Sequence, residues 1–422
     1  QDTQSYKSKH LIEAEWARDP LPKLKAHLVP ALMSEADWAA SEADALRAVE
    51  EALAKAEARP VAAPASVMRF VFSEGADQLQ LKGGQWREGY RPPPSKDASQ
   101  PQGPRIPMAI AIRRTLDHEL SINPRLLVFG EDVGPKGGVH GVTDGLQKKH
   151  GAERVFDTSL SEEGIIGRAV GMALAGLAPV AEIQFRKYAD SAVEQINDCG
   201  TMRWRTANRF AAPIVVRMPV GFAKCGDPWH SQTNEVQFVH SPGWQVVVPA
   251  NAEEAVGLLR TAMRGNDPVM FFEHRALLMT PSAAYPGDDF TLPFGKARDV
   301  ATGEAISIVT WGAMVERCVE AAKGASAHIL DLRTLAPWDS EAVLRSARRT
   351  RRCLIVHEDL GTAGFGAEIA AVLAQEAFLD LDAPITRLTM PDIPSPHHPE
   401  LLEWALPSVA RIREKIADLV AF

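Results

Sequence analysis

The chain has 422 residues, of which 45% are hydrophobic and 24% are charged, so it is long enough for two compact domains of an ordinary globular protein. Its net charge of -8 argues against nucleic acid or an anionic membrane as the main partner. No apolar run has the length of a bilayer span and no signal-peptide pattern opens the sequence, so we expect a protein of the cytoplasm or an organelle matrix.

The four cysteines lie far apart and form no CxxC pair, which disfavours a zinc site and a disulfide framework. We expect most of them to be buried as small hydrophobic side chains. Cys225 is the candidate for exposure, because it stands beside Gly226 in a polar loop.

Residues 1–74 predict a helical tail. Ser34 followed by Asp37 is a capping signal, and the helical pattern of apolar residues that follows is ended by Pro60. The tail has too few large apolar side chains to fold alone, so we expect it to dock on another surface. Residues 75–106 are rich in Gly, Pro, Ser and Gln and predict a linker.

From residue 107 onward, predicted strands and helices alternate, which indicates mostly parallel sheets covered on both faces. We expect an α/β fold of two doubly wound domains, residues 107–285 and 286–422, after the helical tail. The first domain has predicted strands at 126–132, 154–158, 178–184, 213–219, 244–250 and 269–274, and predicted helices at 108–123, 162–176, 189–208 and from 252. The second has predicted strands at 305–312, 327–335, 353–359 and 385–390, and predicted helices before 324 and from 340, 364 and 406.

The stretch from Asp157 to Gly176 places two adjacent acids, Glu162 and Glu163, between a strand and a helix interrupted by glycines. Glycines destabilise a helix, so we expect a neighbouring element or a ligand to approach that face closely. Glu162 stands at the carboxyl end of a parallel strand, where open α/β sheets bind ligands. A carboxylate that caps the positive end of the helix is the alternative interpretation.

Several segments, in one order from about residue 107 to the end, resemble the β subunit of the thiamine-diphosphate-dependent 2-oxo acid dehydrogenases. They include GEDVGPKGGVHG, AEIQF, WHSQTNE, LDLRTLAPWD and VHEDLGTAGFGAEIAA. The resemblance implies a pyrimidine-binding domain and a transketolase C-terminal-like domain. It also implies oxidative decarboxylation of a 2-oxo acid, with transfer of the acyl group to a lipoyl group of the acyltransferase component. AEIQF and FFEH favour branched-chain or other hydrophobic 2-oxo acids over pyruvate.

The resemblance also implies roles for particular residues. Glu162 would hydrogen-bond a ring nitrogen of the cofactor's aminopyrimidine, and a carboxyl shielded from water has the raised pKa that proton sharing needs. Tyr188 would stack on the aminopyrimidine ring, and Leu160 and Gln184 would line the same pocket. His230 would lie near the reacting carbon as a proton donor or as a stabiliser of developing charge. We assign Glu163 to the end of the helix.

The chain departs from the family pattern at several positions. Ser159 replaces a proline, and the sequence before His230 carries Asp227, Pro228 and Trp229. Arg186 and Lys187 occupy a wall of the expected substrate channel, so substrate identity is open. A potassium site near Asp267 lacks one expected acid, since Gly265 stands there.

The sequence contains no Gly-Asp-Gly turn, the motif that holds magnesium and the diphosphate of the cofactor. We therefore expect that half of the site in an α subunit, within an α2β2-like assembly that includes a second copy of this chain. The tail resembles the C-terminal end of an α subunit, which suggests that α and β are fused in the gene.

Three other functions compete with this interpretation. A dinucleotide-binding enzyme is disfavoured, because Gly361, Gly364 and Gly366 do not form GxGxxG. A transketolase-like thiamine enzyme shares the pyrimidine domain and its glutamate. A catalytically silent assembly subunit is the third alternative, and the altered Ser159, Asp227 and Gly265 give it some support.

Overall fold

The computed structural model describes residues 5–74, 102–223 and 225–422. The chain divides into a helical unit, Gln1–Val67, and a larger unit, Met68–Phe422. Most of the predicted linker, residues 75–106, lies outside the described residues, so the expected domain boundaries stay predictions. Among the described helices, none combines the length with the apolar composition that crossing a bilayer requires.

The helical unit contains α1 (Lys9–Trp16), α2 (Pro20–Leu28) and α3 (Glu35–Glu57). The predicted capping signal is confirmed. The Ser34 hydroxyl accepts the Asp37 N–H at 3.1 Å, and the Asp37 carboxylate accepts the Ser34 N–H at 3.2 Å. These two bonds satisfy amide groups that a helix leaves unpaired at its start.

One stripe of α3 is apolar and largely exposed: Leu46, Val49 and Leu53 have exposed fractions of 62%, 65% and 56%. Because such side chains gain stability only when they are covered, the helical unit has a surface suited to docking. The surface on which it docks stays a prediction.

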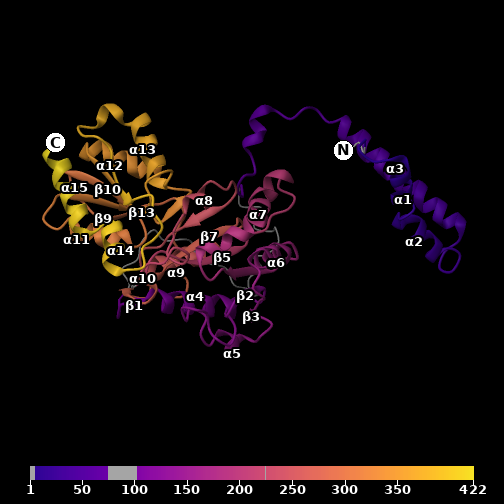
Figure 1. Ribbon diagram of the computed structural model, residues 1–422, viewed down its shortest axis with the longest axis horizontal. Coiled ribbons are helices and arrows are strands. Elements are labelled where there is room, and N and C mark those ends of the chain that lie inside the picture. The colour runs from indigo at the N-terminus through magenta and orange to yellow at the C-terminus, as the bar shows by residue number, and fades with distance from the viewer. Residues whose placement is uncertain (1–4, 75–101, 224) are drawn as a thin grey trace. The chain divides into compact units, whose positions relative to one another are not determined.

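The larger unit holds two doubly wound sheets, which confirms the predicted fold class (Figure 1). The strands of the first sheet are β2 (Leu126–Gly130), β3 (Val155–Asp157), β4 (Ala178–Glu182), β5 (Val215–Val220), β6 (Gln245–Val247), β7 (Val269–His274) and β12 (Thr334–Ala336). Their order is β12-β6-β7-β5-β4-β2-β3, and only β12 runs antiparallel to its neighbour.

Helices cover both faces of this sheet: α4 (Met108–Ile122) and α9 (Ala252–Arg264) pack on one, α6 (Glu162–Leu174) and α7 (Val193–Arg205) on the other. Successive side chains of a strand point to opposite faces, so Val128 of β2 joins the first core and its neighbour Phe129 the second. This explains why the strands read as continuous apolar runs.

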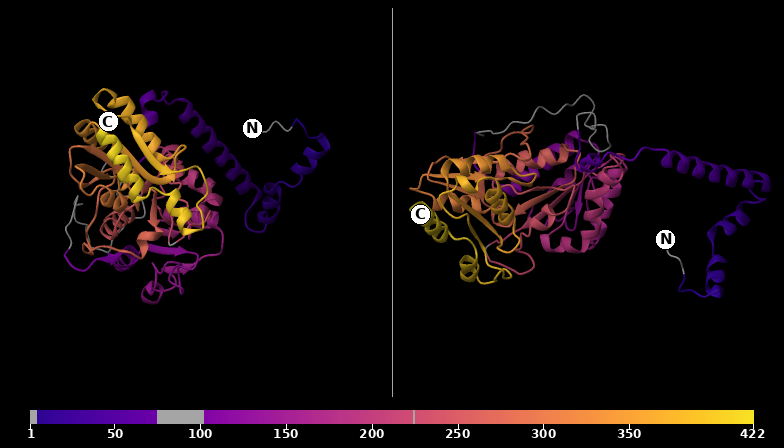
Figure 2. Two further views of the ribbon diagram at one scale, coloured as in Figure 1. Left: turned by 60° about the vertical axis from the view of Figure 1, so that its left-hand side comes forward. Right: turned by 90° about the horizontal axis from the view of Figure 1, so that it is seen from above.

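The second sheet has the order β14-β13-β10-β11-β9, with only β9 antiparallel. Its strands are β9 (Arg298–Ala301), β10 (Ile306–Thr310), β11 (Ala327–Asp331), β13 (Cys353–Leu360) and β14 (Thr386–Met390). Helices α11 (Met314–Ala321) and α15 (Val409–Ala421) cover one face, and α12 (Ser340–Thr350) and α13 (Phe365–Glu376) the other. Figure 2 shows the yellow C-terminal helix α15 against the orange strands.

Short elements complete the larger unit. They are β1 (Ile106–Pro107) paired with β8 (Pro281–Ala283), and the helices α5 (Leu146–His150), α8 (Val236–Val239), α10 (Arg275–Leu278) and α14 (Pro399–Ala405). Three cysteines are buried and Cys225 is exposed, as expected. Burial raises the pKa of Cys318 and of Cys353 to about 12.

Two predicted elements differ in the structure. The helix predicted at 189–208 begins as a 3-10 turn, Arg186–Ala192, and becomes α-helical only in α7. The strand predicted at 327–335 is two strands, because Arg333 adopts a left-handed conformation (φ 60°) between β11 and β12. Beyond the bend β12 pairs with β6 of the first sheet, and the Arg333 side chain donates to Glu254 of α9 at 3.1 Å, so the chain passes here from one sheet to the other.

A buried cation joins three central strands of the first sheet. Arg217 of β5 is fully buried and donates to Glu273 of β7 at 2.6 and 2.9 Å, and to Glu182 of β4 at 2.8 Å. Burial raises the pKa of Glu273 although the Arg217 guanidinium opposes the rise. The ion triad is therefore satisfied only while all three side chains are present.

We expect Arg217→Met to lower the free energy of unfolding by about 3–5 kcal/mol, since it leaves two buried carboxylates without their cation. Urea unfolding followed by tryptophan fluorescence measures this loss. Exposed Arg348, paired with exposed Asp380, is the matched control, and Arg348→Ala should change stability by less than about 1 kcal/mol. An Arg217→Met loss no larger than that of the control would contradict the prediction.

Candidate active site

The parallel strands β2, β3 and β4 end at the same edge of the first sheet, and polar side chains follow each of them. Glu131 follows β2, Glu162 begins α6 after β3, and Gln184 comes shortly after β4. The carboxyl edge of a parallel sheet is where such folds bind ligands. The topology therefore gathers these groups at one edge.

Glu131 and Glu162 act on each other electrostatically. Glu131 is 6% exposed, and its Oε1 has no hydrogen-bond partner among the described residues. Burial raises the pKa of Glu131 to about 6, and the negative charges of Glu162 and Asp132 add to the rise. Glu131 was not among the predicted site residues, although the predicted strand 126–132 ends in acids and so carried the signal.

Glu162 is half-buried at the first position of α6. Its Oε2 accepts the Ser191 hydroxyl at 3.4 Å, and that hydroxyl also lies 3.2 Å from the backbone oxygen of Tyr188. Ser191 thus links the start of α6 to the segment that carries Tyr188. Glu163 is exposed and accepts the Ser161 hydroxyl at 2.9 Å, an arrangement suited to a helix end.

Tyr188, His230 and Asp227 form a continuous row. The Tyr188 hydroxyl lies 2.8 Å from His230 Nε2, and Asp227 Oδ1 lies 2.9 Å from His230 Nδ1. The same oxygen accepts the N–H groups of Trp229 and His230 at 2.7 and 2.9 Å. Burial alone would raise the pKa of Asp227, but these N–H groups outweigh burial and hold the pKa below its usual range.

Phe185 and Arg275 lie next to His230. The Phe185 ring meets the His230 ring edge-on at 4.3 Å, and the Arg275 guanidinium lies 5.4 Å from the Phe185 ring. Arg275 also donates to the backbone oxygen of His230 at 3.0 Å. Burial, followed by the positive charges of Arg275 and Arg217, lowers the pKa of nearby His140 to about 4. His140 is therefore neutral at physiological pH.

The other residues predicted to line the pocket or the substrate channel lie in four different environments. Leu160, in the turn before α6, is 84% exposed. Gln184 donates to Asp132 at 3.2 Å. Arg186 is buried and paired with Asp190 at 2.7 Å, so it forms part of the wall behind the edge. Lys187 lies 5.8 Å from the exposed Trp229 ring beside His230.

The glycine face of α6 is open. A Cβ atom built on Gly171 would meet nothing within 4 Å, and one on Gly167 would meet only Gln195, at 3.9 Å. No described element of this chain therefore makes the close approach that these glycines permit. The face is free for a ligand or for another chain.

The side chain of Asp267 does not fit the predicted potassium ligand. Its carboxylate accepts the Ser73 N–H at 2.9 and 3.1 Å and forms an ion pair with Arg203 at 3.2 Å. Burial raises the pKa of Asp267, and the Ser73 N–H and Arg203 oppose the rise. The Arg203 guanidinium already pairs with this carboxylate, so the Asp267 side chain does not suit a potassium ion.

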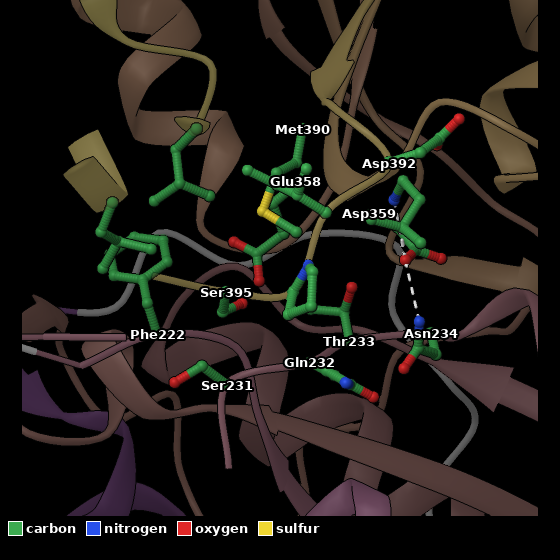
Figure 3. Close-up of a pocket in the computed structure, with 15 residues that line it drawn as sticks. Phe222, Ser231, Gln232, Thr233, Asn234, Glu358, Asp359, Met390, Asp392 and Ser395 are labelled. Atoms are coloured by element: carbon green, nitrogen blue, oxygen red, sulfur yellow. Dashed lines mark hydrogen bonds between the residues drawn. The ribbon is translucent and has the colours of Figure 1, made fainter. Parts of the chain in front are cut away.

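A cavity of about 250 Å³ lies between the two sheets, next to the loop that carries His230 (Figure 3). Ser231 and Gln232 line one side, and Glu358, Asp359 and Asp392 line the other. The dashed line in Figure 3 marks the 3.3 Å hydrogen bond between Asn234 and Asp359. Three carboxyl groups make this cavity unfavourable for an anion.

The chain matches the family models described as transketolase, pyrimidine binding domain, over residues 105–281, and transketolase, C-terminal domain, over residues 295–412. Among solved structures, it resembles one described as split gene transketolase, inactive beta4 tetramer, with a TM-score of 0.62 and 23% sequence identity. The match covers 75% of this chain and 99% of that one, and it supports the fold alone.

The chain is also similar to curated proteins. It is 39% identical over 319 residues to the 2-oxoisovalerate dehydrogenase subunit beta of Bacillus subtilis, covering 74% of this chain and 98% of that protein. It is 41% identical to the 2-oxoisovalerate dehydrogenase subunit beta of Pseudomonas aeruginosa (72% and 92% covered). It is 38% identical to the pyruvate dehydrogenase E1 component subunit beta of Bacillus subtilis (71% and 97% covered). The chain therefore belongs to the family of β subunits of the branched-chain 2-oxo acid and pyruvate dehydrogenases.

Proposed function

We propose that this chain provides the pyrimidine-binding half of a thiamine-diphosphate site and, with an α partner, catalyses the oxidative decarboxylation of a 2-oxo acid. The acyl group passes to a lipoyl group of an acyltransferase component. The observation that carries the proposal is the pair Glu131 and Glu162 at the carboxyl edge of a matched pyrimidine domain, beside an uncovered helix face. When bound, thiamine diphosphate supplies the electron sink that decarboxylation requires.

Glu162 would hold the aminopyrimidine of the cofactor by sharing a proton with one of its ring nitrogens. Neighbouring negative charge favours the protonated form of a carboxyl group. Glu131 supplies such a charge at the same edge, and the charge of Glu162 in turn adds to the rise in the pKa of Glu131. A partner chain packed on the glycine face of α6 would exclude water from Glu162 and strengthen the hydrogen bond.

We assign a second proton transfer to His230. Asp227 Oδ1 lies 2.9 Å from His230 Nδ1, so a proton on Nδ1 would face the carboxylate and leave Nε2 to accept the Tyr188 hydroxyl or to exchange a proton with substrate. Asp227 thus sets the tautomer and the orientation of the imidazole. The Tyr188 hydroxyl contacts His230. The backbone oxygen of Tyr188 contacts the Ser191 hydroxyl, which also contacts Glu162 at the start of α6. We propose that the Tyr188 ring stacks on the aminopyrimidine ring of the cofactor.

The rest of the site belongs to the α partner. Magnesium and the diphosphate need oxygen ligands of the kind that a Gly-Asp-Gly turn and its following Asn supply, and this sequence has no such turn. The uncovered face of α6 fits a site that is closed by a second polypeptide. We propose the α2β2-like assembly on this ground.

We propose a branched-chain or other hydrophobic 2-oxo acid as substrate. Phe185 packs against His230, and Trp229, 59% exposed, stands beside it, so apolar surface borders the proposed reacting position. Lys187 and Arg275 add positive charge near the same aromatic rings, which favours a carboxylate. Rates on a panel of 2-oxo acids with the α partner present test this, and a preference for pyruvate over branched acids would contradict it.

Glu162→Gln should lower kcat at least about 100-fold, because a general acid–base contribution is lost, while the cofactor still binds. The assay is lipoyl-dependent turnover by the complex with α, and calorimetry measures cofactor binding. Glu163→Gln, one residue away at the exposed helix end, is the matched control and should keep near-normal turnover. Near-normal turnover of Glu162→Gln would remove the proposed mechanism.

Asp227→Asn should lower kcat about tenfold with little change in KM, because the ring of His230 loses its charged partner but the substrate contacts stay. Asn keeps an oxygen for the N–H groups of the loop, so the backbone is preserved. Steady-state kinetics at fixed pH measure both constants. A rise in KM with unchanged kcat would show that Asp227 serves substrate binding and does not position His230.

Glu131 should make stability pH-dependent. Its pKa of about 6 in the folded chain exceeds the ordinary 4.5, so the folded state is disfavoured above pH 6 and recovers as pH falls toward 4.5. Glu131→Gln removes this dependence. We expect the free-energy difference between variant and wild type to change by about 1–2 kcal/mol between pH 7 and 5, measured by urea unfolding. A pH-independent difference would contradict the assignment.

A further inference from the structure

A basic groove lies in the second sheet, away from the proposed active site. A cavity of about 470 Å³ opens between the edge strand β9 and helix α12. We call it the β9/α12 groove, and the residues that define it are Lys296, His328, Arg333, Arg345, Ser346 and Arg349.

Cations stand on both walls of the groove. Arg345 and Arg349 line it from α12, one turn apart on the same helix face and separated by about 6 Å along the axis. Lys296 lines it from the segment just before β9. A chain with a net charge of -8 thus concentrates positive charge in one concave place.

The cations on the walls are weakly paired. Arg345 lies 3.6 Å from Glu341 and Arg349 lies 3.5 Å from Glu304, and the acids are 82% and 72% exposed. Exposed pairs of this kind contribute little and exchange readily. Lys296 has no ion-pair partner among the residues that the structure describes.

Two carboxyl groups, Asp299 and Asp339, also line the groove, and both are bonded to other residues that line it. Asp299 lies 2.8 Å from His328 Nε2. Asp339 caps α12, accepting the Ala342 N–H at 3.0 Å, and also accepts the Ala297 N–H at 3.1 Å. Arg333 at the end of the groove is balanced by Glu254, so three cations, Lys296, Arg345 and Arg349, share the lining with two carboxylates and outnumber them.

The floor of the groove is rigid. His328 and Ser346 are buried and hydrogen-bonded to each other, and Ser346 is also bonded to Ser307, which lies 2.7 Å from Thr350. Because these side chains are fixed by one another, the floor keeps its shape without a ligand. Preformed sites lose less entropy on binding.

We propose that the β9/α12 groove binds the oligophosphate group of a small molecule. Guanidinium groups bind phosphate oxygens with paired, charge-assisted hydrogen bonds, and two of them one helix turn apart favour an extended anion over a single phosphate. No Phe, Tyr or Trp lines the groove in the described structure, so the phosphate chain is what the groove recognises. Its volume accommodates a group larger than one phosphate.

The test is calorimetric titration of the full chain with inorganic tripolyphosphate in magnesium-free buffer. We expect saturable binding at one site, weakened about tenfold or more by Arg345→Ala/Arg349→Ala, since charge-assisted hydrogen bonds are lost. Arg348→Ala is the matched control: it removes the same charge from the same helix, but Arg348 bonds to Asp380 and to the Glu376 backbone oxygen. It should change the Kd by less than about twofold.

Lys296→Ala, on the opposite wall, provides a second variant in case the double replacement disturbs α12, and it should weaken binding several-fold. Absence of saturable binding to the wild-type chain would overturn the proposal. Equal weakening by Arg348→Ala and by the groove variants would also overturn it, because it would show attraction to surface charge in general.

Discussion

The site depends on the common direction of β2, β3 and β4. Parallel strands end at one edge, so the residues that follow them meet there even though they are far apart in sequence. This constraint brings Glu131 to Glu162 and sets Glu131 in a buried position that raises its pKa to about 6. The Arg217 triad ties β4, β5 and β7 together behind the same edge. Packing and ion pairing thus hold the acids where their charges interact.

The same constraint leaves the site incomplete in one chain. Helix α6 presents glycines to open space, and Glu162 at its start is only half-buried. Carboxyl groups shift their pKa and share protons effectively when water is excluded. A second polypeptide on the glycine face would provide that exclusion, and it would also bring the diphosphate ligands that this sequence lacks. The proposed chemistry therefore requires the proposed assembly with a second polypeptide.

Local signals were enough for much of the fold. The capping signal at Ser34 and the alternation of strands and helices are confirmed, and the start of α6 at Glu162 follows from the change in periodicity. The division of the predicted strand 327–335 could not be read locally, because β11 pairs with β10 in the second sheet whereas β12 pairs with β6 in the first. The row from Asp227 through His230 to Tyr188 likewise depends on a contact between Tyr188 and His230, which are 42 residues apart. The roles of these side chains stay predictions.

The most direct test of a shared site is calorimetric titration of thiamine diphosphate and magnesium into this chain alone, and into the chain mixed with an α-type polypeptide that carries the Gly-Asp-Gly turn. The account predicts saturable binding in the mixture and none, or binding weaker by orders of magnitude, in the chain alone. Full-affinity binding by the chain alone would contradict it, and so would the absence of binding in a mixture that has assembled.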